Sequence, residues 1–103
     1  MTDDEQFAHE IAYRLDQARK DLATAHKLVE LARIAENSLA LTPASFAVEL
    51  SEEAIKCLEA AKAYGTKDGT SRAQLHDAML AQDSADQNIA EALNALTTRE
   101  QSR

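Results

Sequence analysis

Apolar residues recur at the spacing of an α-helix along nearly the whole chain, and this periodicity limits the fold more than any other feature. Between positions 11 and 32 they follow at alternating steps of four and three, the spacing of a bundle or coiled-coil seam. These residues are Ile11, Leu15, Ala18, Leu22, Ala25, Val29 and Ala32. Only two glycines and one proline interrupt 103 residues, and helix formers such as alanine and leucine dominate. The sequence therefore predicts an all-α protein.

Capping signals predict where the first two helices begin. Thr2 and Glu5 have the spacing of a capping box, so we expect a first helix over approximately residues 3–37. Thr42-Pro43 predicts a restart, because a hydroxyl caps a helix and proline is favoured at the first helical position. The second helix is therefore expected over residues 43–64, after a short connector.

Similar signals place the third helix. Gly65 predicts a left-handed stop after the second helix, and a polar loop should follow. Ser71 and Gln74 repeat the capping-box spacing, which predicts a helix over residues 72–97. Three long helices with short connections predict a single-domain antiparallel bundle, residues 1–103.

Two features of this bundle raise further expectations. The expected first helix is much longer than the other two, so part of its apolar seam would stay exposed to solvent in a single chain. We therefore expect a homodimer that completes the bundle. Gln82 and Asp86 interrupt the apolar stripe of the third helix, which predicts either a polar layer in the bundle or a bend.

Charge and cysteine content exclude several classes of function. The 11 basic and 18 acidic residues give a net charge of −7, which disfavours RNA as a partner. The single cysteine, Cys57, excludes an internal disulfide and is expected to be a small buried residue. Paired Cys/His spacings are absent from the sequence, so we expect no metal and no cofactor. The acidic N-terminus and the lack of a long apolar run predict a cytoplasmic protein without membrane contact.

One segment of the second helix gathers charged side chains. Glu49, Glu52, Glu53 and Lys56 lie within about one turn of each other, and Glu52 and Lys56 form a favourable i, i+4 pair. One interpretation is a solvated charged flank. The other is a binding site at an interface, with Glu53 drawn towards the neighbouring apolar stripe.

This segment also carries a family resemblance. The alanine-rich entry at residues 44–50, the E-E-x-x-K pattern at 52–56 and the lone His76 in the next helix resemble the AbiV-like branch of the HEPN superfamily. HEPN proteins are helical bundles, commonly dimeric, and many are RNases that pair an arginine with a histidine across four to six intervening residues. The resemblance implies Arg72 and His76 as the catalytic pair, although here only three residues intervene.

The resemblance implies a component of a phage-defence or toxin–antitoxin-type system that acts through a protein partner, with degenerate RNase activity. The alternative is an acidic interaction or inhibitor module without catalysis. A second alternative follows from the pairs Glu49-x-x-Glu52 and Asp83-x-x-Asp86, which resemble those of all-α nucleoside-triphosphate pyrophosphohydrolases. Such pairs would bind magnesium from facing helices. An RNase needs Arg72 and His76 in a basic cleft, whereas an inhibitor needs a continuous acidic face.

Overall fold

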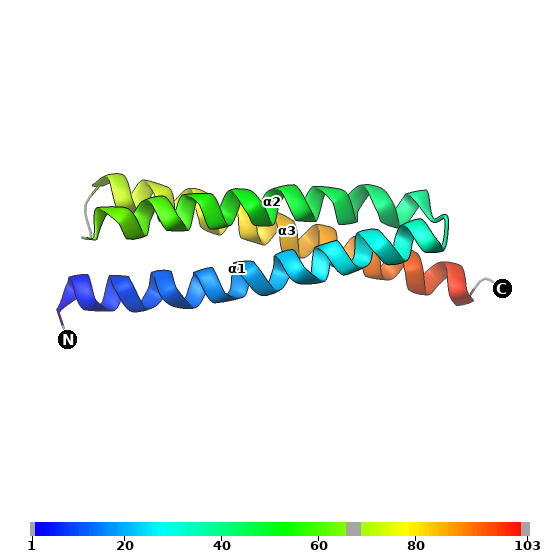
Figure 1. The fold of residues 1–103 in the computed structure, drawn as a ribbon, viewed down its shortest axis with the longest axis horizontal. Helices are drawn as coiled ribbons and strands as arrows, with labels where there is room; N and C mark the ends of the chain where they lie inside the picture. Colours follow the sequence, from blue (N-terminus) through cyan, green and yellow to red (C-terminus); the bar gives the residue numbers. More distant parts are fainter. Residues whose placement is uncertain (1, 66–68, 102–103) are drawn as a thin grey trace.

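Three long helices make up the computed structural model, which describes residues 2–65 and 69–101. They are α1 (Asp3–Ile34), α2 (Ser38–Tyr64) and α3 (Gly69–Gln101). Consecutive helices run in opposite directions in an elongated body of 56 × 20 × 16 Å (Figure 1). The predicted all-α three-helix bundle is confirmed. No helix within the described ranges has the length and apolar character needed to cross a bilayer.

Local capping explains the two helix ends that were predicted correctly. Thr2 is the N-cap of α1, and its hydroxyl accepts a hydrogen bond from the Glu5 backbone N–H at 3.2 Å. Gly65 ends α2 in the left-handed conformation with φ of 71°, where a residue with a Cβ would be strained. Both ends depend on residues close in sequence, which explains why the sequence reveals them.

The turn between α1 and α2 was predicted wrongly. The chain reverses at residues 35–37, because Glu36 adopts a left-handed φ of 53° while the N–H of Asn37 bonds to the carbonyl of Ala32 at 2.9 Å. Asn37, and not Thr42, then caps α2 by accepting from the Ala40 N–H at 3.2 Å. Pro43 consequently lies inside α2. Its missing N–H leaves the carbonyl four residues earlier without the usual helical bond.

The third helix is longer than expected at both ends. It begins at Gly69 and not at Arg72, and it continues to Gln101 and not to residue 97. Ser71 is therefore buried inside the helix and is not its N-cap. Of the polar loop predicted at 65–70, residues 66–68 lie outside the described part of the chain, while residues 69 and 70 are helical.

Buried alanines recur every seven residues in each helix. Each is at most 1% exposed: Ala18, Ala25 and Ala32 in α1; Ala40, Ala47, Ala54 and Ala61 in α2; Ala78, Ala85 and Ala92 in α3. A methyl side chain at each heptad position lets neighbouring helices pack closely, and the seven-residue period favours a left-handed supercoil.

This alanine packing determines which side chains of α3 reach the core. The larger side chains Leu75, Met79, Ile89 and Leu96 are only partly buried, because the alanine stripe occupies the closest approach. Leu93 is 47% exposed.

The larger buried residues form two separate apolar clusters. The first cluster joins one end of α1 to α2 and includes Phe7, Ile11, Leu15 and Leu58. The second cluster, around Leu28 with Ala44 and Ala92, lies towards the α1–α2 turn. The middle of the bundle, between the clusters, is therefore where polar residues can enter the interior.

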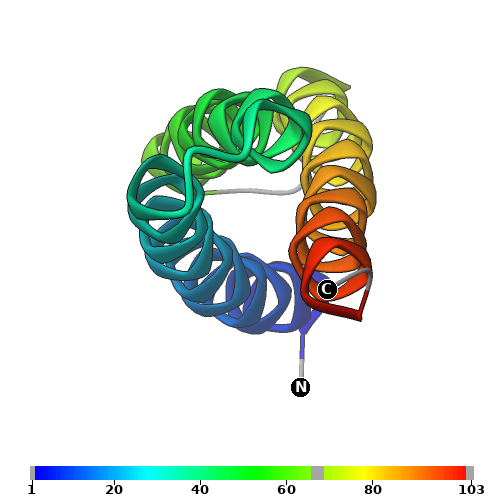
Figure 2. The same ribbon diagram turned by 90° about the vertical axis from the view of Figure 1, so that its right-hand side faces the viewer.

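The arrangement of the helices removes the reason given above for a dimer. α1, α2 and α3 have 32, 27 and 33 residues, so the first helix does not outrun the third. Of its seven seam residues from Ile11 to Ala32, five are buried in the single chain, and Leu22 and Val29 are partly buried. Seen end-on, α2 lies between α1 and α3 (Figure 2), and α1 and α3 make the sparsest of the three helix contacts.

Candidate functional site

Arg72 and His76 are both exposed on the N-terminal part of α3. They belong to successive turns of one helix, so the structure brings their side chains to the same region of the surface. Neither residue lines any of the three cavities described below. A single chain thus presents this pair openly, outside any of those hollows.

The four charged residues of α2 that the sequence singled out are also exposed. Glu49, Glu52, Glu53 and Lys56 all face solvent, so Glu53 is not drawn into the apolar stripe. Glu53 instead accepts a hydrogen bond from the Sγ of Cys57 at 3.7 Å. Cys57 is 7% exposed, and burial, followed by the nearby Glu53 carboxylate, raises the pKa of its thiol. The thiol is therefore protonated near neutral pH and a poor nucleophile.

Glu49 and Glu52 line a groove between α1 and α2 with a volume of about 450 Å³. The opposite wall carries His26, Val29 and Arg33 of α1. At neutral pH the α1 wall therefore carries the positive charge of Arg33, and the α2 wall carries the negative charges of Glu49 and Glu52. The sequence alone did not single out His26, because the groove exists only once α1 and α2 are paired.

The charges along this groove follow the same seven-residue period as the alanines. Arg19, His26 and Arg33 recur on α1, while Glu52 and Glu59 recur on the antiparallel α2. The guanidinium of Arg19 lies 3.8 Å from the carboxylate of Glu59, with both side chains about 60% exposed. Such an exposed ion pair contributes about 0–1 kcal/mol, so it adds little to the stability of the bundle.

A second hollow lies on the outer surface of α2 and is lined by Leu41, Thr42, Ser45, Phe46 and Glu49, with a volume of about 270 Å³. Phe46 is 52% exposed although it belongs to an alanine-rich helix. We call Leu39, Phe46, Glu49, Glu52 and Glu53 the α2 outer surface. All five are exposed on one helix.

Phe46 was missed by sequence reasoning, although a signal was present. Phe46, Glu49 and Glu53 follow at steps of three and four, which places them along one face of the helix. This face differs from the stripe of buried alanines that contains Ala47 and Ala54. The signal was therefore a large aromatic residue away from the buried stripe, beside acidic residues on the same face.

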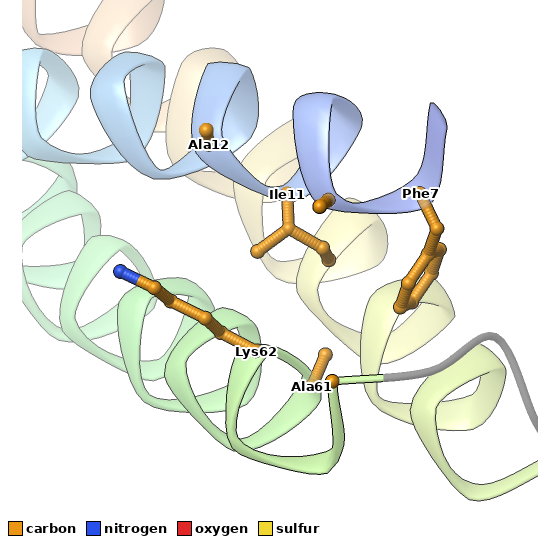
Figure 3. A pocket seen from close by; sticks show the side chains of 7 residues that line it. Phe7, Ile11, Ala12, Ala61 and Lys62 are labelled. Atoms are coloured by element: carbon orange, nitrogen blue, oxygen red, sulfur yellow. The ribbon is translucent and has the colours of Figure 1, made fainter. Parts of the chain in front are cut away.

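A small apolar cavity lies at the other end of the bundle, between α1 and α2. Phe7 and Ile11 point from α1 towards Ala61 of α2, and Gly65 completes the lining (Figure 3). Its volume is about 80 Å³. Among the described residues that line it, Lys62 alone is charged, so these residues offer little to orient a polar ligand.

The polar layer predicted in the third helix is present in the middle of the bundle. Gln82 and Asp86 of α3 lie next to the carboxyl of Asp21 on α1. Burial, followed by the hydrogen bond and the charge of Asp86, raises the pKa of Asp21 to about 7, and a hydrogen bond with Gln82 partly opposes this shift. Asp21 was not singled out from the sequence. The signal was its position seven residues before the buried Leu28, on the same face of α1.

The paired carboxylates that suggested magnesium binding face different neighbours. Glu49 and Glu52 line the α1–α2 groove, whereas Asp86 contacts Asp21 on the α1–α3 side and Asp83 is exposed. Across residues 2–65 and 69–101, no three His, Cys, Asp or Glu side chains are grouped closely enough to hold a metal ion. The fold therefore does not gather these pairs into one site.

Comparison of this chain with protein-family models, with curated proteins and with solved structures gives no match. The resemblance to AbiV-like HEPN proteins consequently rests on the sequence pattern of residues 44–56 and His76.

Proposed function

We propose that this chain is a non-catalytic protein-binding module, and that the α2 outer surface is its contact face. The observation that carries this proposal is the half-exposed Phe46 beside Glu49, in a hollow on α2. In keeping with the resemblance, the module belongs to a cytoplasmic phage-defence or toxin–antitoxin-type system.

The chemistry of this surface defines the kind of partner. Aromatic side chains contribute strongly to binding when a partner covers them, because they bury a large area at low entropic cost. Glu49 lines the same hollow as Phe46, and Glu52 and Glu53 are exposed about two turns further along α2. Together their negative charge steers a basic surface towards this helix. The partner is therefore a protein with an apolar patch flanked by lysine or arginine.

The accessible pair Arg72 and His76 keeps RNase activity as a second candidate function. An arginine can bind a phosphate while a histidine transfers a proton near neutral pH. The net charge of −7 opposes RNA approach. Both residues are exposed on one helix, so such a site would need a second copy of the chain to enclose the phosphate.

The test is capture of partners from the native host by tagged full-length protein. Phe46→Asp should abolish capture of the specific partner, and charge reversal at Glu49, Glu52 and Glu53 should weaken it in a salt-dependent way. The matched control is Leu80→Asp on α3, because Leu80 is similarly exposed at 56%. If Phe46→Asp and Leu80→Asp retain the same partner equally, the α2 outer surface is not the contact face.

Two further measurements separate the alternatives. Light scattering of the purified wild type reveals whether the partner is a second copy, in which case Phe46→Asp should convert a dimer into a monomer. Incubation of the purified protein with host RNA tests catalysis. Cleavage that disappears in His76→Ala and in Arg72→Ala, with an unchanged helical spectrum, would replace the binding module with an RNase.

A further inference from the structure

The interface between α1 and α3 contains buried oxygen atoms that lack a donor. Oδ2 of Asp21 and Oε1 of Gln82 are both buried, and neither has a hydrogen-bond partner. The carboxyl of Asp21 lies against that of Asp86, and two ionised carboxylates can only accept hydrogen bonds. A buried acceptor without a donor destabilises the folded state. These buried oxygen atoms therefore lack a hydrogen-bond donor.

A single proton supplies that donor. When Asp21 is protonated, its O–H can donate to the Asp86 carboxylate, and the repulsion between the two charges disappears. We infer that Asp21 and Asp86 share one proton that links α1 to α3, and that this link is lost as the pH rises. Asp86 is exposed, so the shared proton can exchange with solvent.

The surroundings of Asp21 offer no positive charge to replace this proton. On α1 its neighbours three and four residues away are uncharged, namely Gln17, Ala18, Thr24 and Ala25. The adjacent Lys20 is 3.0 Å from Asp16 in an ion pair. On α3 the charge that acts on Asp21 is that of Asp86, whereas the nearby Gln82 is neutral.

The remaining helix, α2, adds no positive charge beside Asp21 either. Along α2, Ser51 lies between Ala54 of the first apolar cluster and Ala44 of the second. Ser51 is 1% exposed, and its hydroxyl oxygen also lacks a partner. The charged residues next to it, Glu49, Glu52 and Glu53, are all acidic and exposed, and the first two line the α1–α2 groove. The shared proton is thus what reduces the negative charge of the Asp21 and Asp86 carboxylates.

The direction of the pH effect follows from where Asp21 releases its proton. Its pKa is about 7 in the folded chain, against an ordinary value of 3.8. The folded state therefore holds a proton that the unfolded chain has already lost, and stability falls as the pH rises from about 4 to about 7. Because α1 and α3 make the sparsest of the three helix contacts, their separation is the expected consequence at higher pH. This link between helices is a pH-sensitive latch built into the fold.

The experiment measures the carboxyl carbon of Asp21 by NMR in the full-length wild type across pH 3 to 9. A titration midpoint about two or more pH units above that of an exposed aspartate such as Asp83 is expected. A midpoint equal to that of Asp83 would overturn the latch. This measurement is made on the folded wild type, so it does not depend on whether any variant folds.

A pair of variants then tests the link itself. Asp86→Asn removes the charge and provides an amide donor for Asp21, so the Asp21 midpoint should fall by at least one pH unit. The melting temperature should also lose most of its decrease between pH 5 and pH 8. Asp83→Asn, three residues away on the exposed face, should change neither quantity, and the three histidines are common to both variants. Identical pH profiles for the two variants would refute the proposal.

Discussion

Replacing Leu58 by alanine tests the packing of the first apolar cluster most directly. Leu58 is 0% exposed and packs in the cluster that contains Ile11 and Leu15. The change removes three buried carbon atoms, which costs about 2.4 kcal/mol at about 0.8 kcal/mol each. A residual cavity adds to this loss, and buried leucine-to-alanine changes typically cost about 2–5 kcal/mol. We expect a loss of about 3 kcal/mol in the free energy of unfolding.

Urea denaturation followed by circular dichroism measures this loss through the shift of the midpoint at constant slope. For a chain of this size each kcal/mol corresponds to about 4–8 °C in melting temperature, so a decrease of more than about 10 °C should accompany it. Leu93→Ala is the matched control, because Leu93 is 47% exposed and should lose less than about 1 kcal/mol. Equal losses in the two variants, or a loss below about 1 kcal/mol for Leu58→Ala, would refute the assigned packing.

Two further predictions concern the helix ends. Gly65→Ala should destabilise by about 1–2 kcal/mol, because a Cβ disfavours the left-handed φ of 71° although no atom lies within 4 Å of it. Gly69→Ala, at the helical start of α3 and equally unobstructed, should be neutral or stabilising, and a similar loss in both would contradict the backbone argument. Asn37→Ala should cost about 1–3 kcal/mol, because it removes the α2 cap and the 3.3 Å bond from Nδ2 to the Ala95 carbonyl. Asn37→Asp keeps the capping oxygen and should lose less in urea denaturation, so equal losses would show that the cap is unimportant.

The fold class followed from the sequence because its signals are local. Helix formers and a 3.6-residue apolar period specify helices wherever they occur, and only a few turn residues interrupt them. Thr2 and Gly65 were identified correctly because a cap depends on the residues within one turn. The polar interruption at Gln82 and Asp86 was also visible, since it breaks the period of its own helix.

The turn at residues 35–37 shows where local signals were insufficient. Thr42-Pro43 is a good start signal, yet Asn37 became the N-cap. Asn37 is 3% exposed, and it bonds both to α2 and to the Ala95 carbonyl of α3. A contact between residues 58 positions apart outweighs the local preference of Pro43, although Pro43 then lies in the second turn of α2 and removes one helical hydrogen bond.

The candidate sites depended on how the helices are rotated against each other. Only the tertiary structure determined this rotation. The alanine heptads set the closest approach of the helices, and that choice turned Leu93 and Phe46 outward while leaving Ala47 and Ala54 buried. The same rotation brought Asp21 of α1 against Asp86 of α3. A sequence period states which residues share a face of one helix. It does not state which face of another helix they meet, because that is determined by the fit of side chains across the whole bundle.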